Sequence, residues 1–169
     1  HIYTHRREFS LADNHCQLTV TYAKRYNGEE ERKISQLSAA YESYCRLRSA
    51  QDNYTDAVMF AEENYNCVAM AYNPVHPDVQ TASGVLIQCL IHKGDLDKAE
   101  LFAQMTLDSL KDPANKVDQN GDEMATGLYN LGRVVYRQDG DLIKAERLAR
   151  VAYDIRIQLY GKDHNLVGT

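Results

Sequence analysis

The heptapeptide GDLDKAE at residues 94–100 and its near-copy GDLIKAE at residues 140–146 decide the fold of this chain. Looser copies are DNYTDAV at residues 52–58 and REFSLAD at residues 7–13. A shared alanine recurs at steps of 45, 42 and 46 residues, as Ala12, Ala57, Ala99 and Ala145. A repeat of this length is typical of a solenoid, in which each unit buries its apolar face against its neighbours.

Small and apolar residues recur at steps of three and four around each shared alanine, which predicts a helix with one buried face. In the third copy they are Leu96, Ala99, Ala103, Thr106 and Leu110. A partner helix is predicted ahead of each later copy, over residues 33–50, 78–92 and 122–138. A small residue at the shared alanine and four positions later lets the two helices approach closely. No stretch alternates with the period of a strand, so the sequence predicts an all-α fold.

The residues between the helices are typical of helix ends. Gly94 and Gly140 are each predicted to end a helix in the left-handed conformation, and Asp52-Asn53 takes that role in the second copy. Pro77 suits a first helical turn, where its missing N–H costs nothing. The longest connection, Lys111–Gly121, is polar and accounts for most of the extra length of the last step.

Composition bounds the class of protein. The chain has 169 residues, of which 44% are hydrophobic and 25% charged, and this balance is that of an ordinary globular domain. A net charge of −5 predicts no nucleic-acid partner. Apolar runs are too short for membrane insertion and no signal peptide opens the sequence, so we expect a cytoplasmic protein. The four cysteines form no CxxC pair, and Cys16 occupies a repeated small-residue position, which predicts buried reduced thiols rather than a zinc site.

We expect one continuous array over residues 1–169. Its predicted units are residues 1–30, 31–75, 76–119 and 120–162, and residues 163–169 resemble the start of another unit. Because the sequence opens at His1 without a methionine and stops at the start of a further unit, we expect an excised piece of a longer array.

Several segments together resemble the tetratricopeptide repeat, in the 42-residue form found in kinesin light chains. They are Leu131-Gly132, Gly140-Asp141-Leu142, Ala145 with Ala152, and His76-Pro77-Asp78-Val79. The resemblance covers nearly the whole chain, most strongly from about residue 76 onward. One departure is a residue inserted near residues 134–137, which blurs the register there. The resemblance implies a right-handed α-solenoid of antiparallel helix hairpins that binds other proteins.

The sequence offers no constellation for catalysis, a cofactor or a metal. His15 and Cys16 are adjacent, so they point to different sides of a helix and cannot form a dyad. His1 and His5 are four residues apart, but no third ligand accompanies them. His76 and His164 recur at one repeat position, which favours a structural role where a helix begins. We therefore expect no enzyme within these residues, no cofactor and no metal.

The resemblance also implies which positions face a ligand in the groove of such an array. Carried onto this chain, they lie beside the residues matching Leu131-Gly132 in each first helix. Asn130 matches the asparagine with which family members bind an extended peptide backbone, whereas Val85, at the equivalent place in the third unit, does not. The predicted groove residues are Ser43, Arg46, Gln88, Tyr129, Asn130 and Arg133.

Two arginines in the groove of an acidic protein predict a protein or peptide ligand that carries acidic residues. The function predicted is that of an interaction scaffold or adaptor, binding an extended peptide or a partner helix. The alternative is a regulatory or sensor segment of a larger ATPase or kinase. Upstream sequence would separate the two, because a heptad coiled coil favours the adaptor and a phosphate-binding loop favours the sensor. The oligomeric state does not follow from the sequence.

Overall fold

The computed structural model describes residues 2–25, 28–138, 140–162 and 164, and the side chains from Ser10 onward. Within these residues all regular structure is helical, which confirms the predicted all-α class. The elements are α1 (Ile2–Arg25), α2 (Glu30–Ala50), α3 (Tyr54–Ala69), α4 (Pro77–Lys93), α5 (Leu96–Lys111), the short 3₁₀ helix η1 (Pro113–Asn115), α6 (Asp122–Arg137) and α7 (Leu142–Tyr160). They form two compact units, His1–Asn73 (the first unit) and Pro74–Thr169 (the second unit).

The ends of the helices follow the local sequence. The helices predicted over residues 33–50, 78–92 and 122–138 are α2, α4 and α6. Gly94 ends α4 with a φ of 85°, and Asp52 follows α2 with a φ of 56°, so both take the predicted left-handed conformation. Pro77 occupies the first turn of α4, and the imidazole Nδ1 of His76 accepts a hydrogen bond from the Asp78 N–H at 3.2 Å. The structural role expected of His76 is thereby confirmed.

Gly140 does not end a helix, and that prediction is wrong. The α6 helix ends at Arg137, and its C-cap is Gln138 with a φ of −79°. The side chain of Gln138 instead reaches α5, where its Nε2 donates to the Glu100 carboxylate at 3.1 Å and lies 3.5 Å from the carbonyl oxygen of Leu96. A side-chain contact to a neighbouring helix therefore accompanies this helix end.

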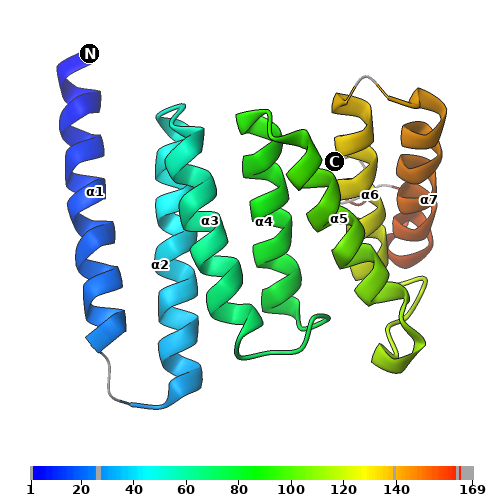
Figure 1. Ribbon diagram of the computed structural model, residues 1–169, viewed down its shortest axis with the longest axis horizontal. Coiled ribbons are helices and arrows are strands. Elements are labelled where there is room, and N and C mark those ends of the chain that lie inside the picture. Colours follow the sequence, from blue (N-terminus) through cyan, green and yellow to red (C-terminus); the bar gives the residue numbers. More distant parts are fainter. Residues whose placement is uncertain (1, 26–27, 139, 163, 165–169) are drawn as a thin grey trace. The chain divides into compact units, whose positions relative to one another are not determined.

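In the first unit, α1, α2 and α3 run antiparallel in succession, with α2 contacting both neighbours (Figure 1). The buried ring of Tyr44 on α2 stacks on Phe60 of α3, with ring centroids 4.3 Å apart. Burial, and after it the nearby carboxylate of Asp13, raises the pKa of Tyr44 to about 12. This aromatic pair therefore joins α2 and α3 in the core of the first unit.

One guanidinium joins all three helices of the first unit. Arg48 on α2 donates from Nη2 to the Asp13 carboxylate of α1 at 2.7 Å and from Nη1 to the Gln51 side chain at 2.9 Å. Its Nε lies 3.6 Å from the Asp56 carboxylate of α3. The Arg48 side chain is only 20% exposed, so these partners replace most of its hydration.

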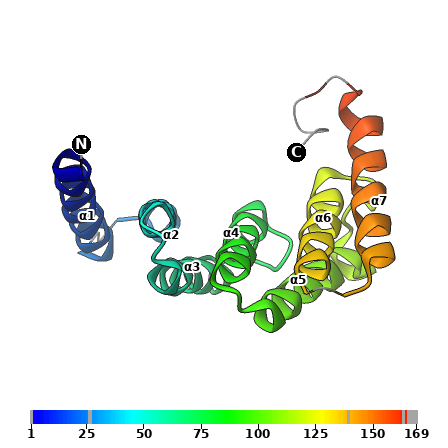
Figure 2. The same cartoon turned by 90° about the horizontal axis from the view of Figure 1, so that it is seen from above.

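In the second unit, α6 lies between α5 and α7 and also contacts α4 (Figure 2). The largest fully buried side chains of the second unit are Leu86, Ile87, Leu90, Leu107, Leu110 and Val134. A Cβ added at Gly127 of α6 would lie 3.0 Å from a methyl group of Leu110 on α5. The absence of a side chain there lets α5 and α6 pack at short range.

The small residues predicted at the helix contacts are mostly buried. Ala57, Ala61, Ala99 and Ala103 are each at most 1% exposed, which confirms their packing role. All four cysteines are free thiols, and Cys16 is buried, as predicted. His1 and the side chain of His5 lie outside the described residues, as do residues 163 and 165–169 of the predicted further unit. Among the described residues, no helix has the length and hydropathy of a membrane span.

Candidate protein-binding site on α6 and α7

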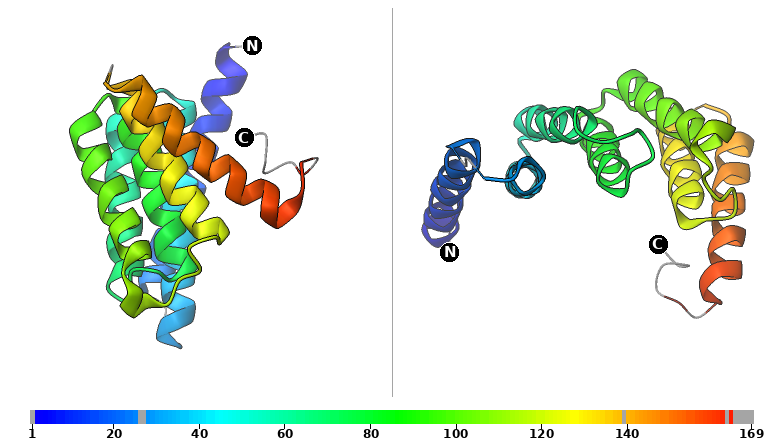
Figure 3. Two further views of the ribbon diagram at one scale, coloured as in Figure 1. Left: turned by 90° about the vertical axis from the view of Figure 1, so that its right-hand side faces the viewer. Right: turned by 90° about the horizontal axis from the view of Figure 1, so that it is seen from below.

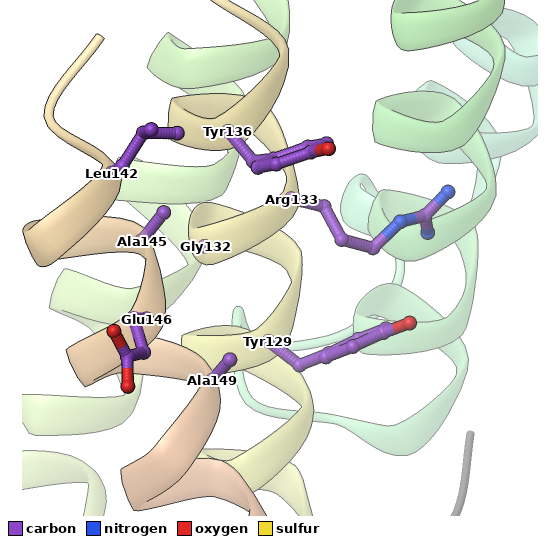
Figure 4. Close-up of a pocket in the computed structure, with 8 residues that line it drawn as sticks. All are labelled: Tyr129, Gly132, Arg133, Tyr136, Leu142, Ala145, Glu146 and Ala149. Atoms are coloured by element: carbon purple, nitrogen blue, oxygen red, sulfur yellow. The ribbon is translucent and has the colours of Figure 1, made fainter.

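The α6 helix has two different faces because its sequence repeats with helical spacing twice. Met124, Leu128, Leu131 and Val135 are buried, and they fix how α6 sits in the second unit. Tyr129, Arg133 and Tyr136 follow each other at steps of four and three, so they share a second face. Figure 4 shows these three side chains projecting to the same side of α6.

The second face of α6 and the start of α7 enclose a pocket of about 400 Å³ (Figure 4). Its α6 wall consists of Tyr129, Gly132, Arg133 and Tyr136, and its α7 wall consists of Leu142, Ala145, Glu146 and Ala149. The pocket stays open at its rim, since Tyr136 is 62% and Leu142 is 61% exposed. Exposed apolar side chains around a hollow are typical of a binding surface.

The two walls are held together at Gly132. A Cβ at this position would lie 3.3 Å from the Leu148 Cβ and 3.4 Å from the carbonyl oxygen of Ala145, both on α7. The left view of Figure 3 shows α7 running obliquely across α6. Gly132, the predicted small residue of the first helix, therefore sets the distance between the walls of the pocket.

Two guanidinium groups flank the ring of Tyr129. The Cζ atoms of Arg133 and Arg156 each lie 5.7 Å from the ring centroid. Arg156 on α7 is anchored, because its Nε donates to the Asp122 carboxylate at 3.2 Å and its Nη2 to the Thr126 hydroxyl at 3.0 Å. For Arg133, the described part of the chain supplies no carboxylate partner. The ring thus holds a cation that remains available to a ligand.

Asn130 is largely buried, with 9% of its surface exposed. Its Nδ2 faces α4, where a Cβ added at Gly84 would lie 3.6 Å from it. Within the described residues its side-chain amide makes no hydrogen bond. An amide in this state has donors and an acceptor to offer to a peptide group.

The other three predicted groove residues are all exposed. Gln88 belongs to α4 of the second unit. Ser43 and Arg46 belong to α2 of the first unit, where the Ser43 hydroxyl donates to the Ala39 carbonyl oxygen at 2.8 Å and Arg46 pairs with the Glu42 carboxylate. The structure therefore brings Tyr129, Asn130 and Arg133 together, and it places Ser43 and Arg46 in a separate unit. A single groove containing all six residues stays a prediction.

The sequence did not reveal the α7 side of this site. Leu142, Glu146 and Ala149 looked like packing residues, because they repeat Leu96, Glu100 and Ala103. No sequence motif pointed to Arg156. Only exposure in the folded chain distinguishes a lining residue from a core residue.

Comparison with known proteins agrees with this architecture. The family model described as a tetratricopeptide repeat matches residues 125–166, which include most of α6 and all of α7. The crystal structure of BtubC (BKLC) from P. vanneervenii has a similar fold, with a TM-score of 0.72 and 19% sequence identity over 96% of this chain. The chain spans 61% of the length of that structure. No curated protein matches the chain.

The matched repeat and the shared fold agree with the resemblance to tetratricopeptide repeats that the sequence predicts. The described residues contain no group of three or more His, Cys, Asp or Glu side chains that could hold a metal ion. The features available to a partner are a charged aromatic face and an apolar pocket.

Proposed function

We propose that this chain is an interaction scaffold that holds an acidic segment of a partner protein against Tyr129, Asn130 and Arg133 of α6. The observation that carries the proposal is the position of Arg133. Its guanidinium rests over the Tyr129 ring, 5.7 Å from the centroid, with no carboxylate of the described chain beside it. A cation that is already ordered loses less conformational entropy when a carboxylate binds, which favours recognition of Asp or Glu.

This face offers a ligand both a positive charge and hydrogen-bonding groups. Arg133 makes the surroundings of Tyr129 positive, whereas the charge of Arg156 is offset by the Asp122 carboxylate. The Asn130 amide supplies a donor and an acceptor for a peptide group of the bound segment. Carboxylate recognition beside backbone recognition fixes both the composition and the register of a peptide.

Arg46 has a smaller part in this proposal. Its guanidinium is paired with the Glu42 carboxylate, and the Arg46 side chain is 77% exposed. A ligand carboxylate there must compete with an existing ion pair in a solvated setting, where such pairs are worth under about 1 kcal/mol. We expect Arg46 to adjust affinity and Arg133 to determine it.

The test uses an array of synthetic peptides in which Asp and Glu vary in number and spacing, probed with the labelled chain. The strongest binding peptide is then titrated against Arg133→Gln and against the control Arg147→Gln, an exposed arginine of α7 that does not line the pocket. We expect Arg133→Gln to weaken binding at least tenfold and Arg147→Gln to change it less than twofold. Equal effects of the two substitutions, or no preference for acidic peptides, would refute the proposal.

A further inference from the structure

A pocket of about 450 Å³, here named the first-unit pocket, opens between α1 and α3 with α2 as its floor. The floor presents the rings of Tyr41 and Tyr44, which are 6% and 4% exposed. The Tyr44 ring stacks on Phe60 of the α3 wall, and Met59 of the same wall adds a thioether to the lining. Aromatic rings and thioethers pack favourably on a further aromatic ring, so the first-unit pocket suits an aromatic occupant.

The equivalent place in the second unit is occupied by a larger, buried side chain. Val20 lines the first-unit pocket, and Leu107 is its counterpart, since each lies eight residues after the shared alanine of its helix. Val20 is half-buried, whereas Leu107 is 1% exposed and its Cδ1 lies 3.4 Å from the place that a Cβ of Gly127 would take. The first-unit pocket therefore depends on the side chains of this unit, and the repeat alone does not produce it.

The first-unit pocket and the exposed apolar side chains of α1 lie on opposite flanks of this helix. The residues of α1 that line the pocket are Gln17, Val20, Thr21 and Lys24. The exposed large apolar residues of α1 are Leu11, Leu18 and Tyr22. With 3.6 residues per turn, the buried Cys16 and Ala23 lie between the two sets, on the face toward α2. In a repeat array a neighbouring helix covers the apolar flank, so the first-unit pocket does not depend on one.

Lys24 and Glu63 place opposite charges on the two walls at one end of the first-unit pocket. Because α1 and α3 both run antiparallel to α2, Lys24 late in α1 and Glu63 in the second half of α3 lie toward the same end, beside Tyr41 (Figure 1). Both charged side chains are exposed, and among the described residues neither forms an ion pair. An available ammonium and an available carboxylate on facing walls complement a ligand that carries both charges.

We propose that the first-unit pocket is a docking site for an extended segment of a partner protein, in which an aromatic residue stands between an acidic and a basic residue. Side chains two positions apart in an extended segment project to the same side, so the charged residues stand two positions before and after the aromatic one. The aromatic ring packs on the tyrosine floor, while the acidic side chain pairs with Lys24 and the basic one with Glu63. This site lies in a different unit from Arg133, so it goes beyond the function proposed above and stands without it.

The experiment uses tryptophan peptides, because the chain contains no tryptophan and the emission then reports the peptide alone. The two probes are acetyl-Lys-Gly-Trp-Gly-Glu-amide and the same peptide with lysine and glutamate exchanged. We expect one of the two orders to bind the full chain with a Kd of about 500 μM and a blue shift of the tryptophan emission. The other order should bind at least threefold more weakly, because it brings like charges together at both walls. An excess of the preferred peptide with alanine in place of tryptophan should displace neither probe.

The variant that fills the first-unit pocket is Thr21→Phe, at an exposed position of the α1 wall. Its matched control is Thr55→Phe, the same change at an exposed position of α3 that does not line the pocket. We expect Thr21→Phe to weaken binding of the preferred peptide at least fivefold and Thr55→Phe to change it less than twofold. Thermal unfolding followed by circular dichroism checks that both variants keep the fold.

Exchanging the two charges of the chain tests the direction of the bound segment. In the double variant Lys24→Glu with Glu63→Lys, the preference between the two peptides should reverse, because each charged side chain now finds its partner on the opposite wall. Arg133→Gln should leave the affinity of both peptides unchanged. The proposal is overturned if neither peptide binds, if both bind equally, or if binding survives Thr21→Phe. A preference that the double variant keeps, or a loss of binding in Arg133→Gln, also overturns it.

Discussion

The first unit and the second unit are both built from successive antiparallel helices, but different interactions hold them. In the first unit, the three helices meet at the guanidinium of Arg48, which contacts Asp13, Gln51 and Asp56. In the second unit, the helices approach closely at Gly127 and Gly132. A repeat plan fixes where helices meet without fixing the chemistry of the contact. The stability of the first unit should therefore depend on substitutions that remove charge, and that of the second unit on substitutions that add side-chain volume.

The largest effect is expected from Gly132→Leu. Its Cβ alone would lie 3.3 Å from the Leu148 Cβ and 3.4 Å from a backbone oxygen, so a full side chain must push α6 and α7 apart. We expect a loss of about 3 kcal/mol in local stability, measured by hydrogen exchange of the α6 and α7 amides. Gly140→Leu is the control, since a Cβ there meets only the Val135 carbonyl oxygen at 3.5 Å. Similar losses in both variants would show that close approach at Gly132 is not what joins the helices.

A smaller loss is expected in the first unit from Arg48→Met, which keeps the apolar stem and removes the charge. It leaves the Asp13 carboxylate without the guanidinium that lies 2.7 Å away. We expect the local stability of α1 and α2 to fall by about 2 kcal/mol, as measured by hydrogen exchange of their amides. The matched control, Arg46→Met, breaks an exposed pair on the same helix and should cost about 0.4 kcal/mol. If Arg48→Met costs no more than Arg46→Met, the ionic account of the first unit is wrong.

Buried polar groups give a third contrast between the units. Ser83 is 1% exposed and its hydroxyl lies 2.6 Å from that of Thr106, whereas Asn64 is 3% exposed and its Oδ1 accepts no hydrogen bond within the described chain. We expect Ser83→Ala to lower the free energy of unfolding by about 1 kcal/mol, because it breaks a satisfied bond. Asn64→Ala should raise it by about 0.5 kcal/mol, because an unpaired carbonyl leaves the core and alanine favours the helix. Urea unfolding followed by circular dichroism measures both, and changes of the same sign would contradict the contrast.

The smallest effect at neutral pH is expected for Tyr44→Phe, since the Tyr44 hydroxyl makes only a long 3.4 Å hydrogen bond to the Asp13 carbonyl oxygen. Its consequence appears in alkali. The folded-state pKa of Tyr44 is raised to about 12 from 10, so its contribution to stability is complete below pH 10 and is lost as the pH rises toward 12. Between pH 9 and pH 12 the native chain should therefore lose more stability than Tyr44→Phe does, in urea unfolding with a reductant present. If both proteins lost the same stability over this pH range, the ionisation of Tyr44 would not be coupled to unfolding.

Local signals in the sequence predicted most of the fold. Asp52, Gly94 and the His76-Pro77 pair marked helix ends because a turn depends on the conformations of a few adjacent residues. Gly140 did not mark a helix end, because α6 ends at Arg137 and the next residue, Gln138, contacts α5. Such a contact between helices cannot be predicted from adjacent residues.

The candidate site was predicted less completely. Tyr129, Asn130 and Arg133 were found because they flank the repeated Leu131-Gly132 pair. The α7 wall was missed, since Glu146 and Ala149 have the same sequence signature as the covered Glu100 and Ala103. Arg46 and Arg133 occupy the same position in their repeats. Only the fold shows that Arg46 pairs with Glu42 while Arg133 lies over the Tyr129 ring.

By itself, the sequence determined that this chain is a series of helix hairpins, where most helices begin and end, and which small residues join them. Those properties follow from helical periodicity and a repeat of nearly constant length, which act over short stretches of chain. The tertiary structure decided which copy of the heptapeptide is covered by α6, which arginine stays available, and where a pocket opens between α6 and α7. Exposure and partnership depend on residues that packing brings together from distant parts of the chain, so two nearly identical stretches acquire different roles.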